Sequence, residues 1–386
     1  MNGNSEGVNH NLSGIADLDI RVKALSREDR KLFRRIFHMS AGEGQLEPPD
    51  SMLPWIEKQF GSIDATKKQK IVKVTNLVTF EGALFNRLRA SRPIETREKL
   101  MIEARIIDHS FDDPLRRPMD STPADTFGRV KGKFTVTASN IAKYDAYHGI
   151  IIFDDYNPLH FDKEEIIDYL DTGWEWAKKA HDADPSAKYY FFLWNCLRRA
   201  GASLLHGHAQ VTLSRGMHYA KIEGLRRAAL RYRSRYKSDY FDDLFSVHQS
   251  LGLAVEMDGV RLMAYLTPVK EKEIMIMSDK YDTPFKEYIY HALACLRDSM
   301  NVTNFNMALF VPPPWKVREN WSGFPIIARM VDRGDQKSGS CDIGTMELYA
   351  ACVISSDPYE VVRLLKQCRL VLPEETEGQP APAAEK

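Results

Sequence analysis

Hydrophobic and polar positions alternate most clearly near the middle of the chain. An apolar run at Tyr189–Trp194 leads into the segment Asn195–Ser214, which carries a glycine-bearing turn and then alternates apolar with polar residues. This pattern predicts a strand, a turn and a second strand. Side chains two residues apart share one face of a strand, so His206, His208 and Gln210 are expected to point toward a common site.

A helical pattern precedes this segment. The stretch Asp162–His181 begins with a capping box, in which Asp162 is followed three residues later by Glu165, and continues with apolar residues at helical spacing. The spacing places Trp174 on the buried face of the helix and Trp176 on its surface. A helix that links two strands in this way is typical of an α+β unit.

The second half of the chain repeats this order of elements. Its predicted elements are, in chain order, a hairpin at Leu253–Thr267, a strand at Lys272–Met277, a helix at Pro284–Met300 and a strand at Asn304–Phe310. The dipeptide Asp258-Gly259 is a strong signal for the hairpin turn. We therefore predict an α+β fold of two related half-folds with antiparallel sheets and crossover helices.

These patterns divide the chain into four regions. Residues 1–80 are predicted to form a helical accessory region with a disordered start, because helical patterns alternate there with loops and a proline-rich break. Residues 81–245 and 246–372 are predicted to form the N-terminal and C-terminal half-folds. Residues 373–386 are rich in Pro, Ala and Glu and are predicted to be disordered.

Composition narrows the classes of partner. Lys and Arg together number 53, as do Asp and Glu, so no overall basic field favours nucleic acid. No apolar run approaches the about 20 residues needed to cross a bilayer, so no membrane partner is expected. The five cysteines are scattered without a C-x-x-C pair, which favours a reducing, cytoplasmic setting.

The polar residues of the central segment suit chemistry at phosphorus. A neutral imidazole is a good nucleophile near pH 7, and a carboxamide donates a hydrogen bond to a phosphoryl oxygen without adding charge. Gly201 allows the backbone to approach an anion closely, and Ser203 adds a hydroxyl. Taken alone, His-x-His is equally compatible with an ordinary pair of packed or surface histidines.

The longer motif carries a family resemblance. The run Gly-Ala-Ser-Leu-Leu-His-Gly-His-Ala-Gln, which ends at Gln210, resembles the active-site segment of the galactose-1-phosphate uridylyltransferase branch of the histidine-triad superfamily. The resemblance implies two histidine-triad-like half-folds and makes His208 the nucleophile, with Gln210 and Ser203 beside it. Asn195 and Gly201 are expected to contact nucleotide or phosphate. Phosphorylases of ADP-sugars and of diadenosine tetraphosphate share the His-x-His-x-Gln core.

Two other segments extend the resemblance. Arg89 and Arg92 match an Arg-x-x-Arg-Pro segment that contacts the nucleotide diphosphate in the family, and Asn140 matches an asparagine that lies against base and ribose. Ile141 stands where the family has an aspartate, which leaves open whether the base is uracil or adenine. Glu347 falls in a segment that resembles the family's sugar-contacting glutamate, commonly reached across a homodimer interface, and is equally compatible with an ordinary surface acid.

The family resemblance implies one candidate cofactor, a structural zinc ion. His160 and His206 match two of the family's zinc ligands, whereas the C-x-x-C pair that supplies the other two has no counterpart. His109 and Asp112 stand at about that place and would complete an irregular nitrogen and oxygen site. The alternative is that the metal site has been lost and replaced by hydrogen bonds.

The resemblance leads to one leading hypothesis and two alternatives. The leading hypothesis is a nucleotidyltransferase that moves a nucleoside monophosphate between a nucleotide sugar and a sugar 1-phosphate through a covalent nucleotidyl-histidine. The first alternative is an ADP-sugar or diadenosine polyphosphate phosphorylase that uses the same histidine. The second is a nucleotide-binding protein without catalysis.

Overall fold

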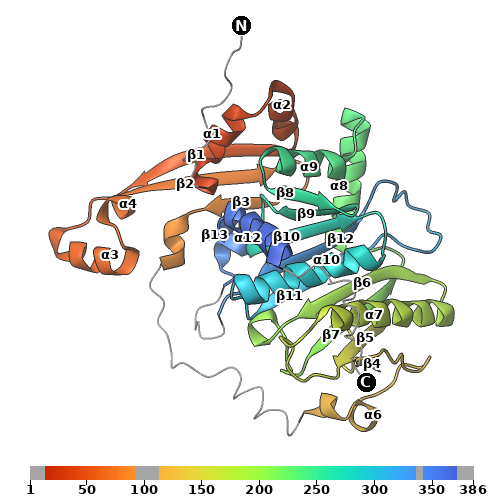
Figure 1. The fold of residues 1–386 in the computed structure, drawn as a ribbon. Coiled ribbons are helices and arrows are strands. Elements are labelled where there is room, and N and C mark those ends of the chain that lie inside the picture. Colours follow the sequence, from red (N-terminus) through yellow and green to blue (C-terminus); the bar gives the residue numbers. More distant parts are fainter. Residues whose placement is uncertain (1–13, 92–112, 336–341, 372–386) are drawn as a thin grey trace, which may run out of the picture.

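The centre of the molecule is a nine-stranded antiparallel sheet, seen in a computed structural model that describes residues 14–91, 113–335 and 342–371 (Figure 1). Its strands, in spatial order, are β4 (Thr135–Ser139), β5 (Tyr147–Phe153), β7 (His208–Arg215), β6 (Ala187–Asn195), β11 (Phe305–Phe310), β12 (Ile326–Asp332), β10 (Glu271–Ser278), β9 (Val260–Ala264) and β8 (Ala254–Met257). Outward from the central β6–β11 pair, the next two strands are β7 and β5 on one side and β12 and β10 on the other. β7 therefore corresponds in position to β12, and β5 corresponds to β10. The prediction of two related half-folds is therefore confirmed.

Each half contributes one long helix to the same face of this sheet. In the first half, α7 (Lys163–Ala183) connects β5 to β6, and in the second half α10 (Thr283–Ala294) connects β10 to β11. The two helices lie side by side and pack against one another (Figure 1). A fold of helices on one side of an antiparallel sheet leaves the opposite face for other contacts.

Local signals in the sequence account for α7. Asp162 accepts a hydrogen bond from the Glu165 N–H, and the Glu165 side chain accepts one from the Asp162 N–H, so the capping box is confirmed. The surface position predicted for Trp176 is wrong. Its side chain is fully buried over Gly149, where an added Cβ would lie 2.7 Å from the indole, and its Nε1 donates to Asp125 at 2.7 Å.

The hairpin turn in the second half is also confirmed. Asp258 and Gly259 have φ angles of 53° and 76° between β8 and β9. Both lie in the left-handed region that this dipeptide tolerates.

The N-terminal region differs from the prediction. It contains the expected helices, which are α1 (Leu18–Ala24), α2 (Arg27–Ile36), α3 (Leu53–Phe60) and α4 (Ile63–Lys67). It also contains two long strands, β1 (Phe37–Gln45) and β2 (Lys68–Asn76), which pair along their whole length. Val72 and Val74 are buried at a spacing of two, which is the strand period that the helical interpretation overlooked.

These strands belong to a second sheet that also takes in the C-terminal part of the chain. Its order is β1-β2-β3-β13, where β3 (Gly82–Phe85) runs parallel to β13 (Cys352–Ile354). The remaining helices are α6 (Pro118–Ser121), α8 (Ala220–Tyr236), α9 (Tyr240–Ser250), α11 (Thr345–Tyr349) and α12 (Pro358–Val371). Within the described ranges, no helix has the length and apolar character required to pass through a bilayer.

Candidate active site around the histidine motif

The histidine motif lies at the start of β7. His208 is the first residue of the strand and pairs with Ile152 of β5, while Gln210 pairs with Ile150. His206 precedes the strand, which differs from the expectation that all three polar residues occupy one strand face. The reason is local, because the Gly207 N–H donates to the Tyr156 carbonyl and the Phe153 carbonyl accepts from His206 Nε2, both at 2.9 Å, so the regular ladder with β5 ends there.

His208 and Gln210 face away from the long helices. Gly173 of α7 lies against Ile151, Tyr190 and Val211, which places these residues on the helix-covered face of the sheet. Side chains alternate between the two faces of a strand, so the even-numbered residues of β7 point to the opposite face. The reactive groups of the motif therefore share the face that α7 and α10 leave uncovered.

The His208 ring is held in one tautomer. Its Nδ1 lies 2.7 Å from the carbonyl oxygen of His206 and can only donate to it, so the lone pair is on Nε2. Burial lowers the pKa of His208 below its ordinary value of 6.5, although the bond to that carbonyl opposes the shift. Nε2 makes no hydrogen bond to any described residue. The result is a neutral imidazole whose Nε2 carries the lone pair and has no hydrogen-bond partner within the described residues.

The His206 ring, next to the carbonyl that orients His208, is itself held at both nitrogens. Its Nδ1 lies 2.6 Å from Asp113 Oδ2, and its Nε2 donates to the Phe153 carbonyl oxygen at 2.9 Å. Burial alone would raise the pKa of Asp113, but hydrogen bonds from His206 and from the Leu115 N–H lower it below its ordinary value. An ionised, buried carboxylate thus anchors the motif from a segment 93 residues away.

The amide of Gln210 is also oriented by hydrogen bonds. Its Oε1 accepts from Tyr144 Oη at 3.1 Å and lies 2.8 Å from Nε2 of His148. His148 is completely buried, and burial lowers its pKa. Asn140 Nδ2 lies 3.1 Å from the same His148 nitrogen. With its oxygen engaged, Gln210 presents its Nε2 amide, which makes no hydrogen bond to a described residue, as a donor beside His208.

The turn before the motif is supported by the second half-fold. Gly201 has a φ of 100°, a left-handed conformation that favours glycine. Asn306 of β11 donates to Asn195 Oδ1 at 2.7 Å and to the Ala200 carbonyl at 2.8 Å, while its own Oδ1 accepts from Arg333 at 2.5 Å. Arg333 can only donate, so both amides have a fixed orientation and Asn195 directs its NH₂ group toward the Gly201 turn. Both halves of the chain therefore build this site.

The other predicted site residues are less clearly connected with the histidine motif. Ser203 and Arg89 are exposed, and Arg92 lies outside the described residues. The Glu347 carboxylate accepts from Gly344 N–H at 2.9 Å and caps α11. Its contact with a sugar remains a prediction.

The described residues do not assemble the predicted zinc ligands. Both ring nitrogens of His206 are engaged by Asp113 and Phe153, and His160 is largely exposed, with its Nδ1 3.4 Å from Asp155. Across 14–91, 113–335 and 342–371, no group of three His, Cys, Asp or Glu side chains could hold a metal ion. His109 and Asp112 lie outside the described residues, so zinc remains a prediction and no step below depends on it.

Sequence reasoning missed four residues of this site. His148 and Tyr144 orient Gln210, Asp113 anchors His206, and Asn306 orients Asn195. Asp113 directly follows Asp112, one of the predicted zinc ligands. The position of His148 on β5, two residues before the partner of Gln210, is a signal that strand pairing could have supplied.

Solved structures with similar folds agree with the motif. An ADP-glucose phosphorylase from Arabidopsis thaliana with bound ADP-glucose matches 75% of this chain and 96% of its own, with a TM-score of 0.58 and 13% identity. A GalT-like protein from Arabidopsis thaliana matches 76% and 97%, with a TM-score of 0.55 and 14% identity. A uridylyltransferase matches 78% and 99%, with a TM-score of 0.53 and 12% identity.

These matches cover nearly the whole of each known structure. The chain has the fold of the galactose-1-phosphate uridylyltransferase-like branch of the histidine-triad superfamily. No protein-family model and no curated protein matches the sequence. Because the identities are 12–14%, the similarity to this branch establishes the fold alone, and activity has to be argued from the site.

Proposed function

We propose that this protein is a nucleotidyltransferase that moves a nucleoside monophosphate between a nucleotide sugar and a sugar 1-phosphate. The single observation that carries the proposal is the His208 ring, which is neutral, fixed in one tautomer and unpaired at Nε2 within the described residues. Such a nitrogen is suited to covalent catalysis at phosphorus. The motif's place in a uridylyltransferase-like fold supports the same chemistry.

In the first step, His208 Nε2 attacks the α-phosphorus of the donor. A nitrogen–phosphorus bond forms, the bond from that phosphorus to the bridging oxygen breaks, and the electron pair leaves with the sugar 1-phosphate. The Gln210 amide and the Asn195 NH₂ group would donate to the phosphoryl oxygens as charge develops. One donor of this kind contributes about 2.7–4 kcal/mol in comparable oxyanion sites. Arg89 and Arg92 are proposed to hold the diphosphate.

In the second step, a phosphate oxygen of the acceptor sugar 1-phosphate attacks the nucleotidyl phosphorus. The nitrogen–phosphorus bond breaks and its electron pair returns to His208, which regenerates the free imidazole. Dividing the transfer into two displacements predicts ping-pong kinetics. Glu347 is proposed to bind the sugar.

A phosphorylase of ADP-sugars is the second candidate. It would form the same intermediate and discharge it with inorganic phosphate in place of a sugar phosphate. Two observations favour retaining it, namely the fold shared with an ADP-glucose phosphorylase and Ile141 at the position where the family has aspartate.

Intact-mass spectrometry after incubation with UDP-glucose or ADP-glucose tests the proposal. We expect a covalent adduct whose added mass identifies the transferred nucleotide, and its loss in His208→Gly. His38→Gly is the matched control, because His38 is exposed on β1 and takes no part in the site. Absence of an adduct with both donors, or an adduct that persists in His208→Gly, would contradict the proposed nucleophile.

The acceptor distinguishes the two candidates. The isolated adduct should be discharged by galactose 1-phosphate if the protein is a transferase, and by inorganic phosphate if it is a phosphorylase. The rate of adduct loss with each acceptor, measured on the same preparation, decides between them.

A further inference from the structure

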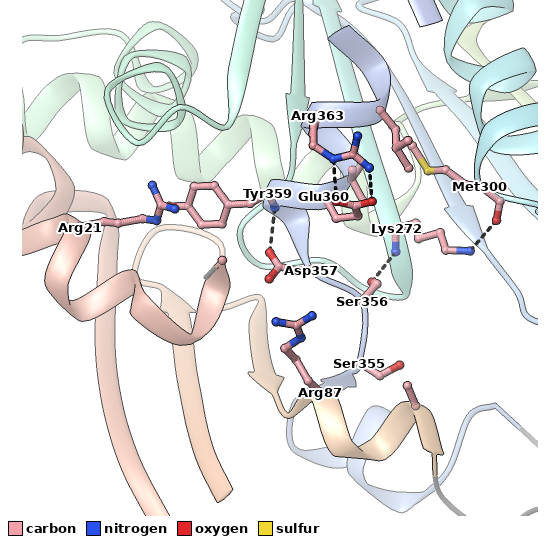
Figure 2. A pocket seen from close by; sticks show the side chains of 14 residues that line it. Arg21, Arg87, Lys272, Met300, Ser355, Ser356, Asp357, Tyr359, Glu360 and Arg363 are labelled. Atoms are coloured by element: carbon pink, nitrogen blue, oxygen red, sulfur yellow. Dashed lines mark hydrogen bonds and ion pairs between the residues drawn. The ribbon is translucent and has the colours of Figure 1, made fainter. Parts of the chain in front are cut away.

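A cavity of about 610 Å³ lies between the N-terminal region and α12 (Figure 2). Its walls come from α1, the short helix at Arg87–Ser91, β10 and the start of α12, and none of its lining residues belongs to the strands that carry the histidine motif. Pockets for small molecules in proteins span about 300–1,000 Å³. The cavity, which we call the α12 cavity, is therefore of ligand size and separate from the candidate active site.

Cationic side chains outnumber carboxylates in its lining. Among the described residues that line it, four carry positive charge and two carry carboxylates; the cations are Arg21, Arg87, Lys272 and Arg363, and the carboxylates are Asp357 and Glu360. Figure 2 shows Arg87 pointing from the short helix toward the loop before α12. These cations come from four separate segments of the chain, so only the folded protein gathers them. A surplus of guanidinium groups in a hollow favours phosphate or carboxylate.

The backbone amides near α12 are already used by the protein itself. The Ser355 and Ser356 N–H groups donate to the Glu271 carboxylate at 2.9 and 2.8 Å, and Asp357 accepts from the Tyr359 and Ile15 N–H groups at 2.9 Å each. The start of the helix is thus capped from within the chain. An anion in the α12 cavity would have to be bound by the arginine side chains.

The remaining walls suit the body of a small polar molecule. The Tyr359 ring carries the Arg21 guanidinium at 4.1 Å on one face, and Met300 and Leu364 add apolar surface. The Glu360 carboxylate, which pairs with Arg363, retains lone pairs that can accept from hydroxyl groups. Cations for a phosphate and carboxylates for hydroxyls therefore occur in one hollow.

The backbone of β10 is distorted at Lys272, which lines this cavity. Its φ is 54°, which is unusual for a residue with a side chain, and it lies in an irregularity between Glu271 and Ile274. Its N–H donates to Ser356 Oγ at 2.9 Å, while its Nζ binds Asp332 at 2.9 Å. The distortion joins the central sheet to the loop that borders the cavity.

We propose that the α12 cavity binds a small phosphate ester that bears hydroxyl groups. Arg87 and Arg363 bind the phosphate, Glu360 accepts from hydroxyls, and the Tyr359 ring packs against the ligand body. This site is independent of His208 and binds its ligand without transforming it. Because α1 and α12 both border it, an occupant tightens the contact between the N-terminal region and the C-terminal helix.

Isothermal titration calorimetry of the full chain with glycerol 3-phosphate tests this site. Arg87→Gln and, separately, Arg363→Gln should each weaken binding at least tenfold, whereas His208→Gly should leave it unchanged. Arg215→Gln is the matched control, since Arg215 is exposed and pairs with Asp184 far along the chain from the cavity. Thermal melting of each variant verifies that it is folded, and both cavity arginines are exposed enough for their replacement to be tolerated.

Three results would overturn the proposal. They are the absence of binding to the unaltered protein, unchanged affinity in both cavity variants, and an equal loss in Arg215→Gln, which would indicate unspecific attraction to positive charge. Loss in His208→Gly alone would assign the phosphate ester to the histidine site. Formation of the nucleotidyl adduct is measured separately, so the two proposals fail independently.

Discussion

The imidazole of His208 combines two properties that the proposed covalent step requires. Burial keeps the ring neutral, and the single bond from Nδ1 to the His206 carbonyl directs the lone pair outward. Exposure of the residue is only 7%, so the ring is largely shielded from bulk water. Asp113 acts one step further away by holding the His206 ring.

The lowered pKa of His208 predicts the acid limit of the proposed adduct formation. Only the neutral ring is nucleophilic, and a pKa below 6.5 means that protonation removes it at a lower pH than for an exposed histidine. We expect the rate of adduct formation to hold as pH falls through 6.5 and to decline only below that value. Single-turnover rates across about pH 5 to 8 measure this. An acid limb centred above 6.5 would show that burial does not govern the ring.

The motif could be predicted from the sequence because its residues are contiguous. Its partners could not, because His148 is 62 residues from Gln210 and Asp113 is 93 residues from His206. Only strand pairing and loop packing bring such groups together. The same holds for Trp176 of α7, whose burial depends on the missing side chain of Gly149 on β5.

At the scale of elements, the backbone hydrogen bonds of Gly207 to Phe153 and Tyr156 determine where β7 begins. The Gly207 N–H donates to the Tyr156 carbonyl and its carbonyl accepts from the Phe153 N–H, both at 2.9 Å. A Cβ on this residue would lie 2.7 Å from the Phe153 ring and 2.8 Å from the Asp155 carbonyl oxygen. The position of His208 thus depends on a residue without a side chain.

Gly207→Ala is expected to destabilise the protein and displace His208, the proposed nucleophile. Overpacking of this kind costs about 1–3 kcal/mol, because the backbone of the adjoining loop has to move. Gly224→Ala on α8 is the matched control, since a Cβ there has nothing within 4 Å and the same exchange in a helix stabilises by about 0.5–1 kcal/mol. Urea unfolding of both variants gives the two free energies. Equal stability of the variants would refute the close contact.

Elements with strong local signals were predicted well, and those formed by pairing were not. The capping box of α7 and the Asp258-Gly259 turn each depend on a few neighbouring residues. β1 includes Ser40, Gly42 and Gly44, which have low strand propensity, and it becomes a strand by pairing with β2. Its sequence alone therefore gave no strand signal.

At the scale of the whole molecule, a buried ion cluster joins the small sheet region to the central sheet. Arg329 of β12 binds Glu273 of β10 at 2.5 Å and Glu81, next to β3, at 2.7 Å. The side chain of Glu273 is fully buried, and that of Arg329 is 13% exposed. Tyr265 adds a hydrogen bond to Glu81 at 2.7 Å.

Arg329→Met should strongly destabilise the whole fold. Removing one partner leaves uncompensated buried charge, which typically costs about 3–5 kcal/mol. Arg215→Met is the comparison, because its pair with Asp184 is largely exposed and such surface pairs contribute about 0–1 kcal/mol. Chemical denaturation of both variants measures the difference. A change below about 1 kcal/mol for Arg329→Met would mean that the cluster contributes little.

The pairing of β6 with β11 has a consequence for any attempt to divide the chain. Those two strands occupy the middle of the nine-stranded sheet, where each satisfies the other's backbone groups. A fragment that ends after the first half would open a long hydrogen-bonding edge on β6, which favours aggregation. It would also lack Asn306, which orients Asn195 beside the Gly201 turn. Severing the protein at its midpoint would thus cost the first half both its neighbouring strand and a contact that shapes the turn before His208.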